Sequence, residues 1–260
     1  VRFYYLQITQ QDHYSTLAEV NRISILPLVP NRGLIFDRHG KVLAQNYSAY
    51  ALEITPSKVP DIESTLDELA AFIEITPTDR QRFMKLKKES RRFKSLPIRN
   101  RLNETEIATF ATNRYRFPGV EIKSRVFRQY PEKELVSHVV GYISRINDKD
   151  LDFLELNNEL NNYRGSQHIG KIGIEQSYEK QLHGITGFEE VETDAAGRSI
   201  RVLSRTLPIS GNNLILSLDF GLQEAVEKAF GDRRGALVAL DPNNGEILAF
   251  VSKPGYDNNL

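Results

Sequence analysis

The chain is 260 residues long, and its 34 basic and 34 acidic residues give a net charge of zero. This balance lacks the long-range attraction that a nucleic-acid-binding protein needs, so we expect no nucleic-acid partner. The absence of cysteine excludes disulfides, thiolate catalysis and cysteine-ligated metal sites. No apolar run approaches the roughly 18 residues that cross a bilayer.

The first residues combine a basic side chain with aromatic ones, at Arg2, Phe3, Tyr4 and Tyr5. Such a segment is typical of the point where a membrane helix enters water, and also of an ordinary strand or helix start. Because the first residue is Val1 and not methionine, we expect further residues upstream.

Residues 33–37 and 41–45 are predicted to form a hairpin, with Gly40 supplying the positive φ angle of a tight turn. Before it, prolines keep residues 17–31 extended. After it, residues 50–54 continue as a strand. Three charged residues and two glycines of this hairpin and its start stand out: Arg32, Gly33, Asp37, Arg38 and Gly40. We expect the charges to form an ion network that locks the turn and the glycines to relieve backbone strain. No nucleophile lies nearby, which favours a structural role.

Two or three short helices are predicted between residues 61 and 114. Asp61 is a good N-cap, Thr76 precedes a proline and an acid in capping positions, and Asn103 opens a third helix. The side chains expected to face the core are Ile62, Leu66, Leu69, Ile73, Phe83, Leu86, Ile107, Phe110 and Ala111.

The second half of the chain mixes short strands and helices. The predicted segments are first a strand over 119–130, helices near 134–140 and after Asn147, and a polar loop over 157–168. A helix marked by Ile174, Tyr178 and Leu182 follows, and Gly184 and Gly187 end it. The last segment is a hairpin of 188–193 with 199–203 across 194–197. The acids Glu189, Glu190, Glu192 and Asp194 are distributed over the two sides of a strand, so they cannot all converge on one substrate, and they are interpreted as a solvated edge.

Residues 208–213 are the best candidate for a linker. After it the pattern predicts a strand over 214–218, a helix formed by Leu222, Val226, Ala229 and Phe230 and closed by Gly231, and a hairpin over 235–252. This unit is interpreted as the beginning of a new domain.

A basic stretch runs from Arg80 to Arg101, with ten Lys or Arg and a single acid, Glu89. A solvated helix and loop explains such a stretch. The alternative is a docking patch for an acidic partner, an anionic lipid or a cell-wall polymer, formed by Lys87, Lys88, Arg91 and Arg92. The histidines, His13, His39, His138, His168 and His183, lack metal-ligand spacing, so we expect no metal, and no cofactor is expected.

Several segments resemble class B penicillin-binding proteins, in the family's order along the chain. The first are the hairpin signature over 32–44, Phe117-Pro118-Gly119-Val120-Glu121, Arg128-x-Tyr130-Pro131 and residues 138–143. The next is the block from Gly170 to Gly187, which contains Gly173-Ile174-Glu175 and Tyr178-Glu179. The last are Ser217-Leu218-Asp219 and the final hairpin. Residues 116–121 and 146–150 most closely resemble the elongation-type subfamily of Gram-negative rods, penicillin-binding protein 2.

The resemblance implies a serine D,D-transpeptidase that cross-links peptidoglycan stem peptides and is acylated by β-lactams. In the family, Ser-x-x-Lys, Ser-x-Asn and Lys-Thr/Ser-Gly motifs supply the chemistry, downstream of the hairpin that corresponds to residues 235–252. We therefore expect these motifs to lie beyond Leu260, the last residue of the sequence, and assign no catalytic residue here.

Three short strings could be mistaken for the family's catalytic motifs. They are Ser177-x-x-Lys180, Ser210-x-Asn212 and Lys171-x-Gly173, and they occur in the wrong order along the chain. Ser177 and Lys180 are also expected to face away from the core side of their helix. The three strings are interpreted as chance matches.

The predicted architecture is an elongated, β-rich α+β pedestal over 1–208, with a helical head insertion over about 61–114 and the first elements of a transpeptidase domain over 209–260. By resemblance, its partners are a RodA-type glycan polymerase and MreC. The full protein is expected to be a single-pass inner-membrane enzyme held by an upstream helix, with this region in the periplasm and inactive by itself. The alternative is a non-catalytic scaffold or interaction module of the elongation machinery.

Overall fold

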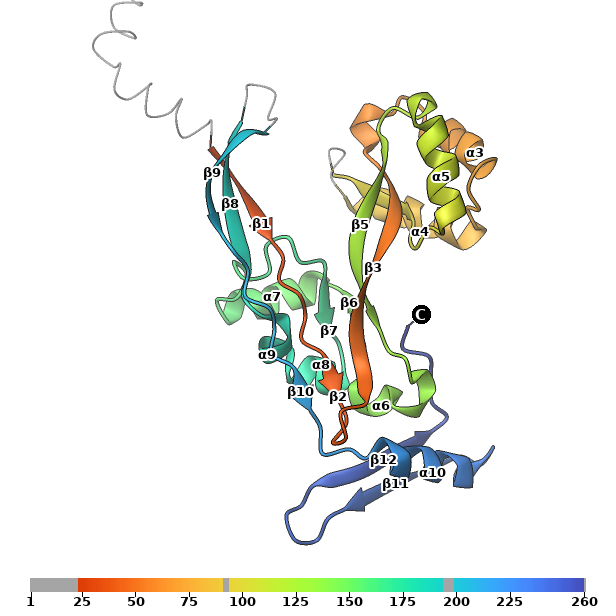
Figure 1. Cartoon of the computed structure of the whole chain (residues 1–260), viewed down its shortest axis with the longest axis vertical. Helices are drawn as coiled ribbons and strands as arrows, with labels where there is room; N and C mark the ends of the chain where they lie inside the picture. The colour runs from red at the N-terminus through yellow and green to blue at the C-terminus, as the bar shows by residue number, and fades with distance from the viewer. Residues whose placement is uncertain (1–22, 91–93, 194–198, 260) are drawn as a thin grey trace, which may run out of the picture. The chain divides into compact units, whose positions relative to one another are not determined.

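A computed structural model describes residues 23–90, 94–193 and 199–259 (Figure 1). Helices and strands alternate along the chain, which confirms the predicted α+β class. The chain forms two compact units: residues 46–127, here called the inserted unit, and residues 1–45 with 128–260, called the discontinuous unit.

Some sequence-based expectations fall on residues that the structure does not describe. Residues 2–5, His13, the predicted turn at 194–197 and the last residue, Leu260, lie outside the described residues. The expectation that the catalytic motifs follow Leu260 therefore stays a prediction.

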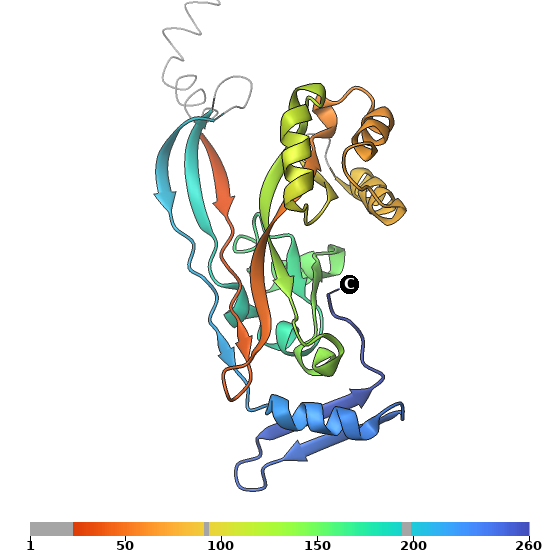
Figure 2. The same cartoon turned by 45° about the vertical axis from the view of Figure 1, so that its right-hand side comes forward.

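The inserted unit is a helical cluster around strand ends. Its elements are the strands β3 (Val42–Ile54), β4 (Leu96–Arg99) and β5 (Val120–Gln129), the helices α3 (Ile62–Ala70), α4 (Pro77–Glu89) and α5 (Glu104–Asn113), and the short turns η2 (Pro56–Lys58) and η3 (Arg114–Arg116). Strand β3 pairs with β4 and with β5, and both β3 and β5 run on into the discontinuous unit. The helices α3, α4 and α5 gather near β4 in both views (Figures 1 and 2).

The three predicted helix starts in this unit are confirmed. Asp61 accepts a hydrogen bond from the backbone N–H of Ser64, and Thr76 and Asn103 each form a reciprocal capping box. The core consists of apolar side chains from all three helices and the strands: Leu52, Ile54, Ile62, Leu66, Leu69, Ile73, Phe83, Leu96, Ile98, Phe110, Phe117 and Val120.

One predicted core position of α5 is wrong. Ala111 is exposed, and Glu106 is buried on this helix together with Phe110. Glu106 turns inward because its carboxylate accepts the backbone N–H of Asn103 and lies 3.2 Å from Nε of Arg99. The capping interaction of Glu106 therefore decides which side of α5 is buried, which hydrophobic periodicity alone did not predict.

Among the described residues, the discontinuous unit contains four sheets or sheet parts and several short helices. Its elements are β1 (Ile23–Leu28), β2 (Ile35–Phe36), η4 (Lys133–Leu135), α6 (Ser137–Val140), β6 (Ile143–Arg145), α7 (Asp148–Leu156), β7 (His168–Gly170), α8 (Gly173–Ser177), α9 (Glu179–His183), β8 (Gly187–Thr193), β9 (Ser199–Thr206), β10 (Leu214–Ile215), α10 (Phe220–Phe230), β11 (Gly235–Leu240) and β12 (Ile247–Lys253). The predicted first hairpin forms between β2 and β3, with Gly40 at a φ of 84°.

The strand β8 lies in the middle of a three-stranded antiparallel sheet, between β1 and β9 (Figures 1 and 2). The interpretation of its acids as a solvated edge is therefore wrong: Glu192 is buried and accepts a hydrogen bond from Nε of Arg201 at 2.6 Å. The central position arises because β1, which contains Pro27 and was expected only to be extended, pairs with β8 over six residues.

The predicted helix around Tyr178 is divided into α8 and α9, because Tyr178 leaves helical geometry with φ −111° and ψ 24°. Gly184 follows α9 at a φ of 83°, as predicted for a glycine that ends a helix. The break brings Glu175 and Glu179, one on each side of it, toward the same set of partners.

Helix α10 lies along the hairpin formed by β11 and β12 (Figure 2). The predicted helix and its end at Gly231 are confirmed; within it, Leu222 and Ala229 are exposed, whereas Phe220 and Gln223 are buried. Gln223 faces inward because its side-chain amide both donates to and accepts from the backbone of Phe250, each at 2.8 Å. Hydrogen bonding decides the orientation of this helix.

The segment over 208–213 is hydrogen-bonded to the start of the first hairpin. Gly211 N–H donates to the carbonyl of Asn31, and Leu34 N–H donates to Oδ1 of Asn213. A Cβ atom on Gly33 would lie 1.9 Å from the carbonyl oxygen of Asn212. The two segments therefore need a glycine where they cross. The division at residue 208 stays a prediction.

Gly33→Ala is expected to destabilise the fold by about 3 kcal/mol, since the obstructing atoms are backbone and a buried overpacking change costs roughly 1–3 kcal/mol. The matched control is Gly40→Asn: its positive φ suits asparagine and no atom lies within 4 Å of its Cβ, so we expect a loss within about 1 kcal/mol. Urea unfolding of both variants measures the difference. Equal losses would contradict the close approach at Gly33.

Candidate functional site: a buried ion cluster and a basic groove

The discontinuous unit contains a buried ion cluster, formed by Arg32, Arg128, Tyr130, Tyr163, Glu175 and Glu179. The guanidinium of Arg32 donates from Nε to Glu175 at 2.7 Å and from Nη2 to Glu179 at 2.6 Å. It also donates from Nη2 to the backbone carbonyl of Glu175 at 3.0 Å. The side chain of Glu175 is fully buried. A planar guanidinium suits this arrangement because it can serve two carboxylates at once.

A second arginine, Arg128, also pairs with the negative charge of Glu175. Arg128 donates from Nε to Oε1 of Glu175 at 2.7 Å and from Nη1 to the carbonyl of Gly33 at 2.7 Å. The hydroxyl of Tyr130 donates to the same carboxylate at 3.2 Å. The buried carboxylate therefore has two cations and a phenol around it, which offsets the cost of removing it from water.

Glu179 has its own set of donors. The hydroxyl of Tyr163 donates to it at 2.8 Å, and the backbone N–H of Gly170 donates at 2.8 Å. The carboxylate thus ties β7 and the loop before it to α9. Both glutamates belong to the Gly170 to Gly187 block, yet sequence reasoning assigned them no role. Their spacing of four residues was the available signal, because acids at that spacing lie on one side of a helix.

Burial and charge shift the titrating groups of the cluster in different directions. Burial opposes the charge on Arg32, but the two carboxylates raise its pKa above the ordinary value. Burial also opposes the charge on Glu179, but the hydrogen bonds from Arg32 lower its pKa. Burial, with the neighbouring carboxylate, raises the pKa of both Tyr130 and Tyr163. The tyrosines therefore stay protonated donors, and the cluster has no group suited to nucleophilic attack.

The predicted ion network of Arg32, Asp37 and Arg38 is replaced by three separate sets of partners. Arg32 binds the two glutamates of the cluster. Asp37 is buried and accepts backbone N–H groups, from Lys41 at 2.7 Å and from His39 at 2.9 Å. Arg38 forms an exposed pair with Glu246 at 3.3 Å. The turn is thus locked by a carboxylate that caps backbone donors.

In the described part of the chain, no hydrogen bond joins the side chains of Ser177 and Lys180. Ser177 is exposed at the end of α8, and Lys180 lies in α9 beyond the break at Tyr178. The ammonium of Lys180 pairs with Glu159 at 3.0 Å and is itself largely exposed. A serine nucleophile needs a base within hydrogen-bond reach, and the ion pair of Lys180 is with a carboxylate on another segment.

His183 is buried beside the cluster. Its ring stacks on Tyr163 with a centroid distance of 4.0 Å, and its Nε2 lies 2.9 Å from the hydroxyl of Ser166. Burial lowers the pKa of His183. The imidazole is therefore neutral at pH 7, with its Nδ1 facing the carbonyl of Gly184 at 3.3 Å.

No described helix is long and apolar enough to span a bilayer. Within the same described residues, no three or more His, Asp or Glu side chains come together in a way that could hold a metal ion.

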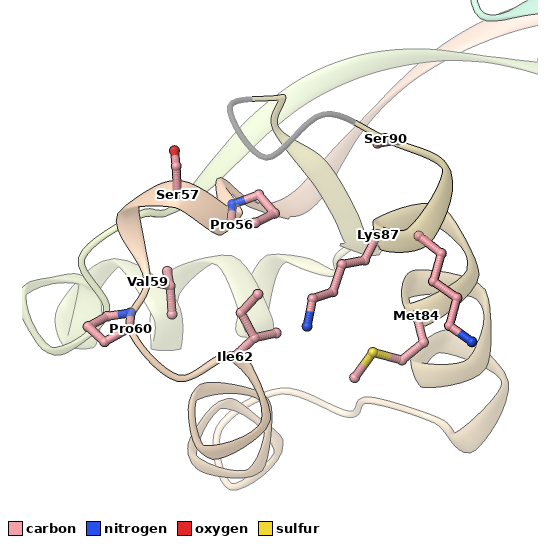
Figure 3. A pocket seen from close by; sticks show the side chains of 9 residues that line it. Pro56, Ser57, Val59, Pro60, Ile62, Met84, Lys87 and Ser90 are labelled. Atoms are coloured by element: carbon pink, nitrogen blue, oxygen red, sulfur yellow. The ribbon is translucent and has the colours of Figure 1, made fainter.

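The inserted unit has an open cavity of about 760 Å³, here called the groove (Figure 3). It lies between the segment of η2 with the start of α3 on one side and the second half of α4 on the other. Its apolar lining consists of Pro56, Val59, Pro60, Ile62 and Met84. Two lysines of the predicted docking patch, Lys87 and Lys88, also line it and are exposed. The other two residues of the patch, Arg91 and Arg92, lie outside the described residues.

Arg32→Met is expected to lower the free energy of unfolding by about 3–5 kcal/mol, the usual cost of removing one partner from a buried ion pair. The control is Arg38→Met, whose exposed pair with Glu246 contributes at most about 1 kcal/mol. Chemical unfolding at pH 7 measures both losses. A loss below about 1 kcal/mol for Arg32→Met would show that the buried cluster is not needed for stability.

His183 predicts a pH dependence of stability. Because the folded state lowers its pKa below the ordinary 6.5, the unfolded chain binds more protons, so stability rises with pH through this range and is lost as the pH falls below about 6.5. His183→Gln is expected to reduce this dependence between pH 7 and 5, whereas His138→Gln, at an exposed position, is expected to leave it in place. Unfolding curves at several pH values measure the slope, and an unchanged slope in His183→Gln contradicts the assignment.

Comparison with known proteins agrees with this fold. Residues 27–216 match the family model described as "Penicillin-binding Protein dimerisation domain". The chain is 44% identical over 257 residues to the peptidoglycan D,D-transpeptidase MrdA of Escherichia coli K12, covering 99% of the chain and 41% of that protein. It is 44% identical to the MrdA of Acinetobacter baumannii, covering 38% of it, and 40% identical to that of Haemophilus influenzae, covering 40%. The chain thus spans about two fifths of these relatives.

Two solved structures are also similar. A complex between penicillin-binding protein 2 and MreC from Helicobacter pylori matches with a TM-score of 0.72 and 28% identity, covering 91% of this chain and 44% of that one. Penicillin-binding protein 2 of Pseudomonas aeruginosa, in complex with WCK 5153, matches with a TM-score of 0.52 and 31% identity, covering 91% and 32%. The chain therefore belongs to the penicillin-binding protein family, in its class B, penicillin-binding protein 2 group.

Proposed function

We propose that these residues are the non-catalytic pedestal of a peptidoglycan D,D-transpeptidase that cross-links stem peptides during cell elongation. The observation that carries the proposal is the 44% identity over 99% of the chain to a protein of that activity. In the proposed organisation the pedestal spans residues 1–208, a head insertion occupies about 61–114, and residues 209–260 begin the transpeptidase domain.

The proposed division of labour leaves the chemistry to residues beyond Leu260. Acyl transfer needs a serine whose hydroxyl proton passes to a base as its oxygen attacks the D-Ala–D-Ala carbonyl, with release of the terminal D-alanine. The exposed Ser177 has no such base in its neighbour Lys180, which pairs with Glu159. The buried cluster of Arg32 and Glu175 supports a mechanical role instead, since it holds the first hairpin to the block that contains α8 and α9.

The second proposed function is that of an interaction module. A similar solved structure contains penicillin-binding protein 2 together with MreC, and this favours an MreC-type partner for the present chain. We further propose a RodA-type glycan polymerase as a partner, an inner-membrane anchor of one upstream helix, and a periplasmic location for the residues described here. The basic patch of Lys87, Lys88, Arg91 and Arg92 is a proposed docking surface.

The first proposal is tested with a fluorescent penicillin. The 260-residue chain is expected to show no stable covalent label after denaturing electrophoresis, whereas the full-length protein made from the same gene is expected to be labelled and to lose the label after competition with unlabelled penicillin. A full-length protein that cannot be labelled would contradict the transpeptidase assignment. Labelling of the 260-residue chain that disappears in Ser177→Ala would contradict its role as a non-catalytic pedestal.

A further inference from the structure

The basic groove of the inserted unit combines an apolar lining with cations that have no internal partner among the described residues. The inserted unit, residues 46–127, carries 15 basic and 11 acidic residues, a net charge of +4 within a chain that is neutral as a whole. Several of its acids are engaged in ion pairs: Glu53 with Arg125, Asp67 with Arg80, Asp79 with Arg82 and Glu106 with Arg99. Uncompensated positive charge therefore remains on this unit.

Lys87 and Lys88 carry part of that excess at the groove. Both are exposed in the last turn of α4, and in the described part of the chain no ion pair or hydrogen bond joins either side-chain ammonium to another residue. Lysines at a helix C-terminus also stabilise the helix dipole, which explains a positive charge at this place. The dipole does not explain why the apolar surface beside them is left uncovered.

The apolar lining comes from two segments that face each other across the opening. Pro56, Val59 and Ile62 come from the chain around η2 and the start of α3, and Met84 comes from α4. Figure 3 shows the ammonium of Lys87 between Ile62 and Met84, so that a group in the opening contacts apolar and cationic atoms together. The volume, about 760 Å³, is in the range of pockets that hold a small ligand.

We propose that the groove binds an acidic peptide segment of a partner protein, with an apolar side chain of the segment in the groove and a carboxylate beside it on Lys87 and Lys88. Charge complementarity selects an acidic ligand, and the apolar lining selects one that also carries a hydrophobic anchor. A membrane surface is disfavoured, because a flat layer of headgroups cannot enter a concave site between two segments of chain. This inference deepens the proposed interaction function and rests on it.

The chain offers a direct reporter for the test, because Met84 is its only methionine. Labelling with ¹³C-methyl methionine gives one internal NMR signal, which lies in the groove and is identified by its loss in Met84→Leu. Twelve-residue peptides are selected from an unbiased display library against the 260-residue chain. We expect enrichment of peptides with acidic residues around an apolar one, and we expect these peptides to shift the Met84 signal.

The matched variants distinguish binding at the groove from a general effect of the protein's charge. Lys87→Glu with Lys88→Glu is expected to weaken the selected peptides at least about tenfold, because two attractive charges become repulsive. The control, Lys85→Glu with Lys94→Glu, reverses two exposed lysines of the same unit that do not line the groove, and is expected to change affinity less than about twofold. Circular dichroism confirms that each variant is folded.

Three results would overturn the proposal. The first is a selection that yields no acidic peptide sensitive to the reversal at Lys87 and Lys88. The second is peptide binding that leaves the Met84 signal in place. The third is a Met84 shift caused by phosphatidylglycerol vesicles or by muropeptides while the peptides cause none, which would assign the groove to lipid or to cell-wall polymer. Penicillin labelling of the full-length protein is independent of all three, so the groove and the transpeptidase assignment can fail separately.

Discussion

Burial of the Glu175 carboxylate is the constraint on which the discontinuous unit depends. An ionised group without solvent costs several kcal/mol unless cations and hydrogen-bond donors surround it. Here the donors come from far along the chain: Arg32 lies 143 positions away, Arg128 lies 47 and Tyr130 lies 45. If a compact conformation lacks one of these partners, the Glu175 charge is buried without enough compensation, and that conformation is destabilised. The ion cluster therefore favours one fold over other compact conformations.

The local features of this fold could be predicted from the sequence. Capping residues such as Asp61, Thr76 and Asn103 start helices where the pattern placed them, and the periodic apolar side chains of α3 are buried as expected. These signals act over three or four residues and depend on backbone hydrogen bonds that the sequence itself specifies. The hairpin with Gly40 belongs to the same class, since its turn requires a positive φ.

Features that depend on distant partners could not be predicted. The strand β1 has prolines near it and becomes a strand through its pairing with β8. On α10 the polar Gln223 is buried because its side chain forms hydrogen bonds with the backbone of Phe250. In the ion cluster, Arg32 was expected to bind within its own hairpin, but its partners are on α8 and α9. Charge types are visible in a sequence, whereas the pairing of charges is set by tertiary structure.

The discontinuity of the larger unit has a consequence for the order of events during synthesis. Residues 46–127 are one continuous stretch, so the core of the inserted unit is complete soon after Val120 leaves the ribosome. Strand β1 and Arg32 emerge earlier, yet β8 and the two glutamates follow more than 140 positions later. Closing so long a loop is slow compared with helix formation and local packing. We therefore expect the middle of the chain to fold first, before β1 can pair with β8 and before Arg32 can bind the two glutamates.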